Sequence, residues 1–297
     1  MKFKNMFFLL LMYSAVGCNS SANNITSQTV MITNLDGNSG GSGVIVDHNP
    51  SSSKILTNKH VCEVVKFGGI VNTADNADHM VVSFTTSNIH DLCLIEVQED
   101  LGVAAPIRER APVPFDAAIV SGHPRLAPTT ITSGQFGDKR IITVAIGYRD
   151  CTQSEIANPD TAMMCLLVGK IVQTRVFEAI FVSALIQPGS SGSAVYDLWG
   201  NLGAVIFAGE GELGFGYAVP LEFVLTFLHK ELATLTKEYP KDPSLADQEA
   251  LNNTQVTKKL KDFCDNYLGQ NKTIGQKRIC NRVKMYEDLL KRVKYRL

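Results

Sequence analysis

Residues Gln187–Val195, "QPGSSGSAV", place three serines and two glycines directly after the apolar run "VFEAIFVSALI". Two kinds of structure suit such a stretch. One is a solvated turn between strands, which is the usual meaning of a Gly/Ser cluster. The other is a tightly bent loop that presents a serine hydroxyl and aims N–H groups at a substrate carbonyl. The stretch alone leaves both open, so the rest of the chain has to decide between them.

The chain from Gln28 to about Val219 consists of short runs rich in Val, Ile, Thr and Phe, separated by turns such as "NSGG" and "HNPSSS". Short strands at regular spacing, without intervening helices, indicate an antiparallel sandwich or barrel. After "GFGYAVP" the spacing becomes helical in "LEFVLTFLHKELATLTKEY", where Phe223, Leu225 and Leu228 are among the apolar positions. The sequence therefore predicts an all-β domain that ends in a helix.

Length and composition limit the number of domains and the classes of function that the chain can have. The chain has 297 residues, of which 45% are hydrophobic, and a formal net charge of -1. This is enough for one large domain of about 200 residues, or two small ones, each with a core. Neither the charge nor the composition indicates disorder or nucleic-acid binding, so we expect no nucleic-acid partner.

The N-terminal stretch "MKFKNMFFLLLMYSAVGC" has two early lysines and an apolar run over residues 6–12 that is too short to span a bilayer. This pattern predicts an export signal over residues 1–18 that is removed from the mature protein. Its end, "SAVGC", resembles the bacterial lipobox, in which the cysteine becomes lipid-modified. Cys18 would then anchor the protein to a membrane through a polar tether, residues 19–27. Ala15 stands where the lipobox usually has Leu, and a plain signal peptide is the alternative.

Cysteine usage supports export, because an even number of cysteines in an exported protein permits disulfides. Six remain besides Cys18: Cys62, Cys93, Cys151, Cys165, Cys264 and Cys280. Local spacing favours Cys151–Cys165 and Cys264–Cys280, which leaves Cys62–Cys93, although the sequence does not prove the pairing. No CxxC pair or His/Cys cluster has the spacing of a zinc site, so no metal is expected.

The C-terminal part is predicted to be separate from the β domain. Residues 240–255 form a polar linker, and apolar residues then recur three and four positions apart through residues 256–297. That spacing predicts a hairpin of two amphipathic helices, which would bring Cys264 and Cys280 close together. Lys and Arg outnumber Asp and Glu here. Such charge belongs either to a solvated helix face or to a surface that docks on an anionic membrane or an acidic partner.

Three residues in the order His, Asp, Ser have contexts that suit hydrolysis by a serine. His60 in "ILTNKHVC" closes an apolar β-like run, Asp91 in "HDLCLIEV" precedes an apolar strand, and Ser191 lies in the Gly/Ser loop. A serine nucleophile needs a base, the base needs an orienting carboxylate, and the oxyanion needs fixed donors. Taken singly, His60 could as well be a structural histidine, which is the more common role of a lone histidine. Asp91 could as well be an ordinary aspartate at the start of a strand.

The loop itself offers an oxyanion hole. Gly189 allows its own N–H group and that of Ser191 to point into one pocket, and Gly192 leaves room around the nucleophile. Ser190 and Ser193 are rival hydroxyls, but each flanks the central position.

These motifs resemble trypsin-like serine peptidases of the chymotrypsin fold, most closely the bacterial HtrA-type branch. The resemblance rests on "GSGVIVDHNPSSSKILTNKHV", "DLCLIEV", "ALIQPGSSGSAVYDLWGNLGAVI" and "GFGYAVP", and it covers about residues 28–237. It implies two packed six-stranded antiparallel barrels over residues 28–239, with the catalytic groups at their junction. It also implies that no cofactor is needed. The chain departs from the branch by lacking room for a PDZ domain and by having Ser193 where glycine is usual.

The same resemblance points to four apolar residues for the substrate pocket. They are Leu185, Ile206, Phe207 and Ala208. A charged substrate side chain would lose its hydration there without gaining a partner, which costs several kcal/mol. We therefore expect a small or medium aliphatic residue at P1, the substrate position before the scissile bond.

The sequence supports an exported serine endopeptidase that acts on proteins or peptides through His60, Asp91 and Ser191. Two alternatives remain: a catalytically idle, protease-like binding module, and an esterase. The esterase is disfavoured because "GSSGS" leads into a strand, whereas the nucleophile elbow of esterases leads into a helix. No motif indicates an oligomeric state.

Overall fold

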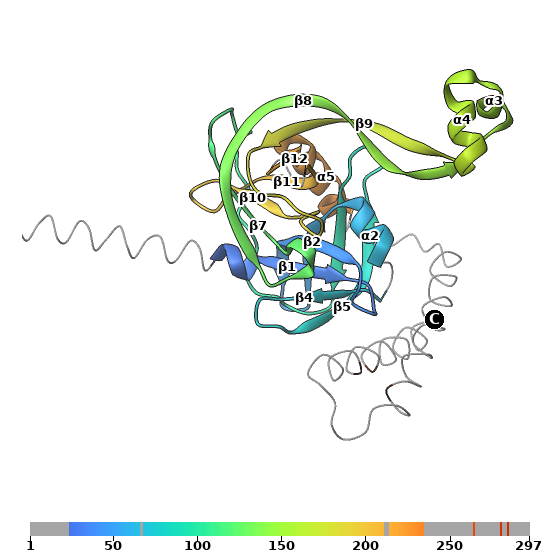
Figure 1. Cartoon of the computed structure of the whole chain (residues 1–297). Coiled ribbons are helices and arrows are strands. Elements are labelled where there is room, and N and C mark those ends of the chain that lie inside the picture. The colour runs from blue at the N-terminus through green and yellow to red at the C-terminus, as the bar shows by residue number, and fades with distance from the viewer. Residues whose placement is uncertain are drawn as a thin grey trace, which may run out of the picture.

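The computed structural model describes residues 24–65, 68–210 and 214–234, together with Cys264, Cys280 and Lys284. Within these residues, twelve strands form two closed antiparallel barrels of six strands each (Figure 1). The prediction of two six-stranded barrels is confirmed. The predicted tether, linker and helical hairpin lie mostly outside the described residues, and so does the predicted export signal.

The first barrel has the strand order β1-β2-β3-β6-β5-β4. Its strands are β1 (Thr29–Thr33), β2 (Gly40–Asn49), β3 (Ser52–Thr57), β4 (Ile70–Asn72), β5 (Asp78–Thr86) and β6 (Cys93–Val97). Branched aliphatic side chains fill its interior, and Val30, Ile45 and Ile95 are among those fully shielded from solvent. These are the residue types that fit a pleated, closely packed surface.

A short helix, α2 (Lys59–Val65), follows β3 directly. The sequence prediction that His60 closes a strand is wrong in this detail, because His60 lies in the first turn of α2. The chain changes from strand to helix one residue before Lys59, at the buried Asn58.

The second barrel has the strand order β10-β11-β12-β9-β8-β7. Its strands are β7 (Ala117–Gly122), β8 (Thr130–Asp150), β9 (Lys170–Val182), β10 (Ala194–Tyr196), β11 (Leu202–Glu210) and β12 (Phe215–Pro220). A single 3-10 turn, η1 (Pro124–Leu126), follows β7, and the helix α5 (Leu221–Thr234) follows β12. The predicted C-terminal helix is therefore present.

A shared apolar core joins the two barrels. It combines Val44 and Leu56 of the first barrel with Tyr196 and Val205 of the second, and α5 adds Phe227 and other side chains. Each fully buried Leu-sized side chain stabilises the packed state by roughly 1.5–3 kcal/mol. The junction therefore belongs to the core of one domain, and the apolar face of α5 covers part of it.

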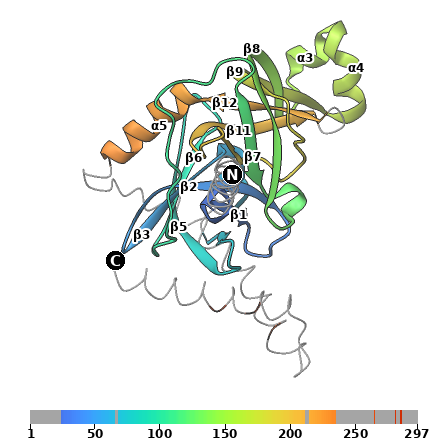
Figure 2. The same cartoon turned by 90° about the vertical axis from the view of Figure 1, so that its left-hand side faces the viewer.

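β8 and β9 continue past the second barrel as a two-stranded arm, residues 140–179, in which they pair only with each other. The arm ends in two helices, α3 (Gln153–Ala157) and α4 (Pro159–Val168), which Figure 1 shows projecting from the barrel. Figure 2 shows this end and α5 on opposite sides of the second barrel. The sequence prediction of strands without intervening helices is wrong here, because α3 and α4 are too short for their residue patterns to indicate a helix.

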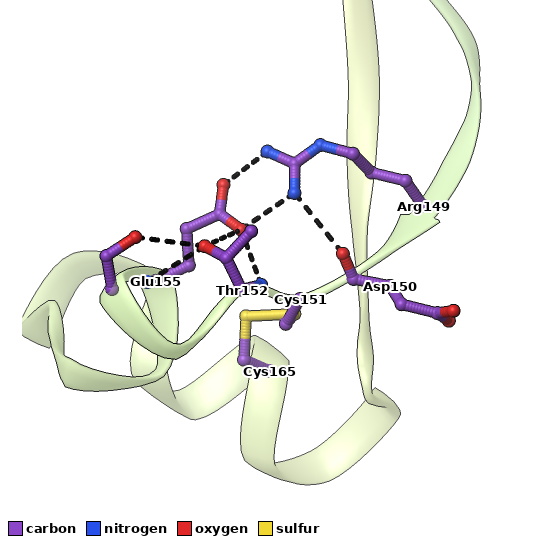
Figure 3. The surroundings of a disulfide bond; sticks show 7 residues. Arg149, Asp150, Cys151, Thr152, Glu155 and Cys165 are labelled. Carbon is purple, nitrogen blue, oxygen red and sulfur yellow. Dashed lines mark hydrogen bonds and ion pairs between the residues drawn. A yellow bond between two sulfur atoms is a disulfide. The ribbon is translucent and has the colours of Figure 1, made fainter.

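The tip of the arm is fixed by a disulfide and a capped helix (Figure 3). Cys151 and Cys165 are bonded, with 5.8 Å between their Cα atoms. Thr152 and Glu155 form a capping box at the start of α3, and Arg149 pairs with Glu155. The guanidinium of Arg149 and the Thr152 amide lower the pKa of the Glu155 carboxyl to about 2. A capping box of this kind satisfies amides that the helix itself leaves unpaired.

The two disulfides favoured by spacing, Cys151–Cys165 and Cys264–Cys280, are present, and so is the remaining pair, Cys62–Cys93. Among the described residues, no helix is long and apolar enough to cross a membrane.

Removing the disulfide Cys62–Cys93 should lower the stability of the barrels. The bond closes a segment with a sequence separation of 31, and both cysteines are fully buried. For a loop of this length, the chain-entropy model gives about 3–4 kcal/mol. We expect the Cys62→Ala/Cys93→Ala variant to lose about this much free energy of unfolding in urea. Cys151→Ala/Cys165→Ala is the control, since it should change the barrels' unfolding midpoint little. Equal losses in the two variants would contradict the expectation.

Candidate active site

The disulfide Cys62–Cys93 fixes the elements that carry His60 and Asp91. Cys62 lies two residues after His60 in α2, and Cys93 lies two residues after Asp91 at the start of β6. The side-chain amide of Asn58 also donates a hydrogen bond to the Asp91 carbonyl, at 2.8 Å. The helix and the loop before β6 are therefore held together on both sides of the histidine.

His60 and Asp91 form a direct pair. The Nδ1 atom of His60 lies 2.6 Å from Oδ2 of Asp91, and the His60 backbone N–H donates to the other carboxylate oxygen at 3.1 Å. The Asp91 side chain is only 14% exposed, whereas that of His60 is 46% exposed. A carboxylate that accepts from Nδ1 fixes the ring's orientation and tautomer, and it leaves Nε2 available for proton transfer.

Ser191 lies in the predicted loop, which connects β9 to β10 and makes two successive turns. Ser190 N–H donates to the Gln187 carbonyl and Ser193 N–H donates to the Ser190 carbonyl, each at 2.9 Å. Gly189 has φ of +90°, a conformation that favours glycine. A Cβ atom there would also lie 2.7 Å from the backbone of Arg125.

The fold brings α2 and this loop to the same part of β2. A Cβ atom added to Gly41 would lie 2.7 Å from a side-chain carbon of Val61 and 2.8 Å from the Ser191 carbonyl oxygen. Val61 is the neighbour of His60 in α2. The next residue of β2, Ser42, donates its N–H to the Ser191 carbonyl at 2.7 Å. The three predicted residues thus lie on elements that meet at the junction of the barrels.

Two of the four residues predicted to line a pocket, Ile206 and Phe207, lie in different clusters. Ile206 packs in the interior of the second barrel, and Phe207 packs in the shared core, where its ring lies 5.3 Å from that of Phe177. Successive side chains of a strand point to opposite faces, so these two cannot face one open pocket. Leu185 is 52% exposed and Ala208 is half-buried, and both stay predictions as pocket residues.

Sequence reasoning missed His123, which lies behind the serine loop. Its Nδ1–H donates to the Ala127 carbonyl at 2.9 Å, and its Nε2 is buried without a hydrogen-bond partner. Burial lowers the pKa of this imidazole, which favours the neutral ring. The carbonyl of His123 lies 2.7 Å from the position of a Cβ on Gly189. In the sequence, His123 stands before a proline in a turn, and this context does not indicate that its side chain is buried beside the serine loop.

Within the described part of the chain, no group of three or more His, Cys, Asp or Glu residues is arranged to hold a metal ion.

Comparison with protein families matches residues 41–205 to the trypsin-like peptidase domain, which is more than half of the chain. The chain belongs to the trypsin-like peptidase family. It is accordingly a serine endopeptidase by family, with proteins or peptides as its substrates, and the predicted relationship to trypsin-like peptidases is confirmed. Among curated proteins, none matches the sequence significantly.

Several solved structures are similar to this peptidase in fold. An inactive form of Rv3671c from M. tuberculosis H37Rv, carrying a serine-to-alanine change, is 18% identical with a TM-score of 0.54, covering 76% of this chain and 96% of that one. The active form of the Rv3671c protease from M. tuberculosis is 16% identical with a TM-score of 0.54, covering 73% and 86%. The HtrA-type protease AlgW, solved with a decapeptide, is 21% identical with a TM-score of 0.47, covering 65% and 51%. At these identities, the likeness to Rv3671c shows a common fold.

Proposed function

We propose that this peptidase hydrolyses peptide bonds through a triad of His60, Asp91 and Ser191. The observation that carries the proposal is the 2.6 Å contact between His60 Nδ1 and Asp91 Oδ2, on elements that meet the serine loop at Gly41. Ser191 would attack the scissile carbonyl. His60 would accept the hydroxyl proton and pass it to the leaving amine, and Asp91 would hold the ring and stabilise its charged form.

The loop geometry supports an oxyanion hole formed by the N–H groups of Gly189 and Ser191. The Pro188 carbonyl accepts from the Arg125 amide at 2.6 Å, and the Ser190 carbonyl accepts from the Ser193 amide at 2.9 Å. The carbonyl and the N–H of a trans peptide point in opposite directions. The N–H groups of Gly189 and Ser191 therefore point away from these partners, and neither donates to another group among the described residues. Free, fixed N–H groups are what a developing oxyanion requires.

The two alternatives fit less well. An esterase of the nucleophile-elbow type has a helix after its serine, whereas the strand β10 follows this loop. An idle binding module has no need of a histidine held by a buried carboxylate beside a serine loop, yet the pair is present.

Fluorophosphonate labelling tests the triad. We expect the folded wild-type domain to be labelled, Ser191→Ala to take up no label, and His60→Ala to react at least about 10³-fold more slowly because the hydroxyl loses its base. His79→Ala is a matched control, since His79 forms a similar pair with Glu99 at 2.8 Å elsewhere in the first barrel. A folded wild-type protein that resists labelling would contradict the proposal and favour the binding module.

We also propose that the substrate pocket prefers small or medium aliphatic P1 side chains. Ile186 lies five residues before Ser191 and is almost fully buried. A Cβ added to Gly209 of β11 or to Gly216 of β12 would lie 2.6 Å from side-chain carbons of Ile186. Ile186 therefore fills the space between the two glycines, and this filled apolar space is what would limit the size of the P1 side chain.

A peptide library with varied P1 residues tests this preference. We expect cleavage after Ala and Val, with discrimination between neighbouring aliphatic residues of only about 10–200-fold, because one methylene is worth about 1–3 kcal/mol. Ile186→Ala should shift the preference toward Leu, Met and Phe by opening the space. Cleavage of the wild type after Lys, Arg, Asp or Glu would contradict the proposal.

The protein is further proposed to be exported and anchored through lipid on Cys18. Three disulfides are typical of an oxidising compartment outside the cytosol, which supports export. Cys18 precedes the first described residue, Asn24, by six positions, a distance of at most about 20 Å along an extended chain. Lipid at Cys18 would hold the enzyme close to the membrane.

Expression in a bacterial host with radiolabelled palmitate tests the anchor. We expect the wild type to carry label, to begin at Cys18 and to stay on the membrane in high salt. Cys18→Ser should lose the label, because the other six cysteines are paired in disulfides. An unlabelled wild-type protein cut at another position would support the plain signal peptide.

A further inference from the structure

Ser42 of β2 holds the serine loop at two points. Its N–H donates to the Ser191 carbonyl at 2.7 Å, and its Oγ donates to the Gly189 carbonyl at 2.8 Å. Ser42 is fully buried. Because β2 belongs to the first barrel and the loop to the second, both bonds cross the junction between the barrels.

The remaining polar groups of Ser42 are also engaged. Its Oγ accepts from the His123 N–H at 2.8 Å, and its carbonyl accepts from the Thr57 hydroxyl at 2.7 Å. The amide of His123 occupies the acceptor side of the hydroxyl, so the hydroxyl proton is directed to the Gly189 carbonyl. The Ser42 side chain therefore has one fixed orientation.

The Gly189 carbonyl lies between the two peptides that carry the free N–H groups. Its own peptide, between Gly189 and Ser190, separates the Gly189 N–H from the Ser191 N–H. A glycine at φ of +90° opposes rotation of its neighbouring peptides less than other residues do. The bond from Ser42 Oγ is the side-chain contact that restrains this peptide among the described residues. Without it, this peptide would keep only the hydrogen bond from the Ser190 N–H to the Gln187 carbonyl, at 2.9 Å, and the alignment of the two free N–H groups would loosen.

We propose that Ser42 is a positioning residue for the oxyanion hole. It keeps the Gly189 and Ser191 amides aligned by binding the carbonyls of the same two residues. This inference rests on the proposed function of Ser191. On this proposal, a residue of the first barrel holds the geometry of the oxyanion hole, although both N–H donors of the hole belong to the second barrel.

The test compares Ser42→Ala with a matched control, Ser121→Ala. Ser121 of β7 is also fully buried, and its hydroxyl also bonds across the barrels, to Thr29 Oγ1 at 2.7 Å. For each purified variant we would measure kcat and KM on a peptide substrate, the affinity for a peptide boronate, the affinity for a cleaved peptide product, and urea unfolding. The product measured is the fragment on the leaving-amine side, which has no carboxylate to place in the oxyanion hole. The boronate, in contrast, forms a tetrahedral adduct that needs the hole.

Losing an oxyanion donor outright costs about 10²–10³ in kcat, so a misaligned pair should cost less. We expect Ser42→Ala to lower kcat and boronate affinity together by about 10- to 100-fold. KM and product affinity should stay within about twofold. Ser121→Ala should change none of these by more than about twofold, although both variants lose a buried hydroxyl and should lose similar stability.

Equal kcat and boronate affinity in the two variants would overturn the role of Ser42 while leaving the triad intact. A wild-type enzyme that cleaves no peptide and takes no fluorophosphonate would overturn the proposed function, and this inference with it. Ser42→Cys gives the same comparison should the alanine variant not fold, because the thiol has similar volume and donates weakly. The kcat and boronate affinity of Ser42→Cys should lie between those of the wild type and Ser42→Ala. If the Ser42→Cys thiol makes no hydrogen bond and both values still equal those of the wild type, the proposal is wrong.

Discussion

The hydrogen bond from the Ser42 amide to the Ser191 carbonyl joins the two barrels at the place where the candidate active site lies. Histidine and aspartate come from the first barrel and the serine from the second, so their alignment depends on how closely the barrels are held. Buried hydrogen bonds in a low-dielectric junction are strong when satisfied and costly when broken. The same contact can therefore serve both the stability of the domain and the geometry of the loop.

The apolar core shared by the barrels supports that contact. Side chains of both barrels and of α5 pack together, and close packing leaves little room for one barrel to shift against the other. The disulfide Cys62–Cys93 adds a covalent restraint on the histidine and aspartate elements. The arm, by contrast, has its own disulfide and capping box, so its tip is fixed independently of the junction.

Much of the site followed from local sequence. His60, Asp91 and the loop around Ser191 were predicted because each has a distinctive neighbourhood. Spacing favoured two of the disulfides, which left the third. Ser42 and His123 were missed because their roles depend on partners far away in the chain, with separations of 147 residues from Ser42 to Gly189 and 81 residues from Ser42 to His123. The pocket prediction placed Ile206 and Phe207 together, although strand alternation directs them to opposite faces. The helices of the arm were missed because α4 is short and mainly apolar, so its pattern does not distinguish it from a loop or strand.

The sequence by itself determined the class of fold and the order of the chemical groups, because these depend on residue type and on neighbours within a few positions. It favoured the pairing of the cysteines without proving it, since the paired residues are 14 to 31 positions apart. The tertiary structure decided which groups meet. Closing the barrels brings β2 against α2 and the serine loop, and only then do Gly41 and Ser42 contact residues of both. The physical reason is that hydrogen bonds and packing act over a few ångströms in space, whatever the separation along the chain.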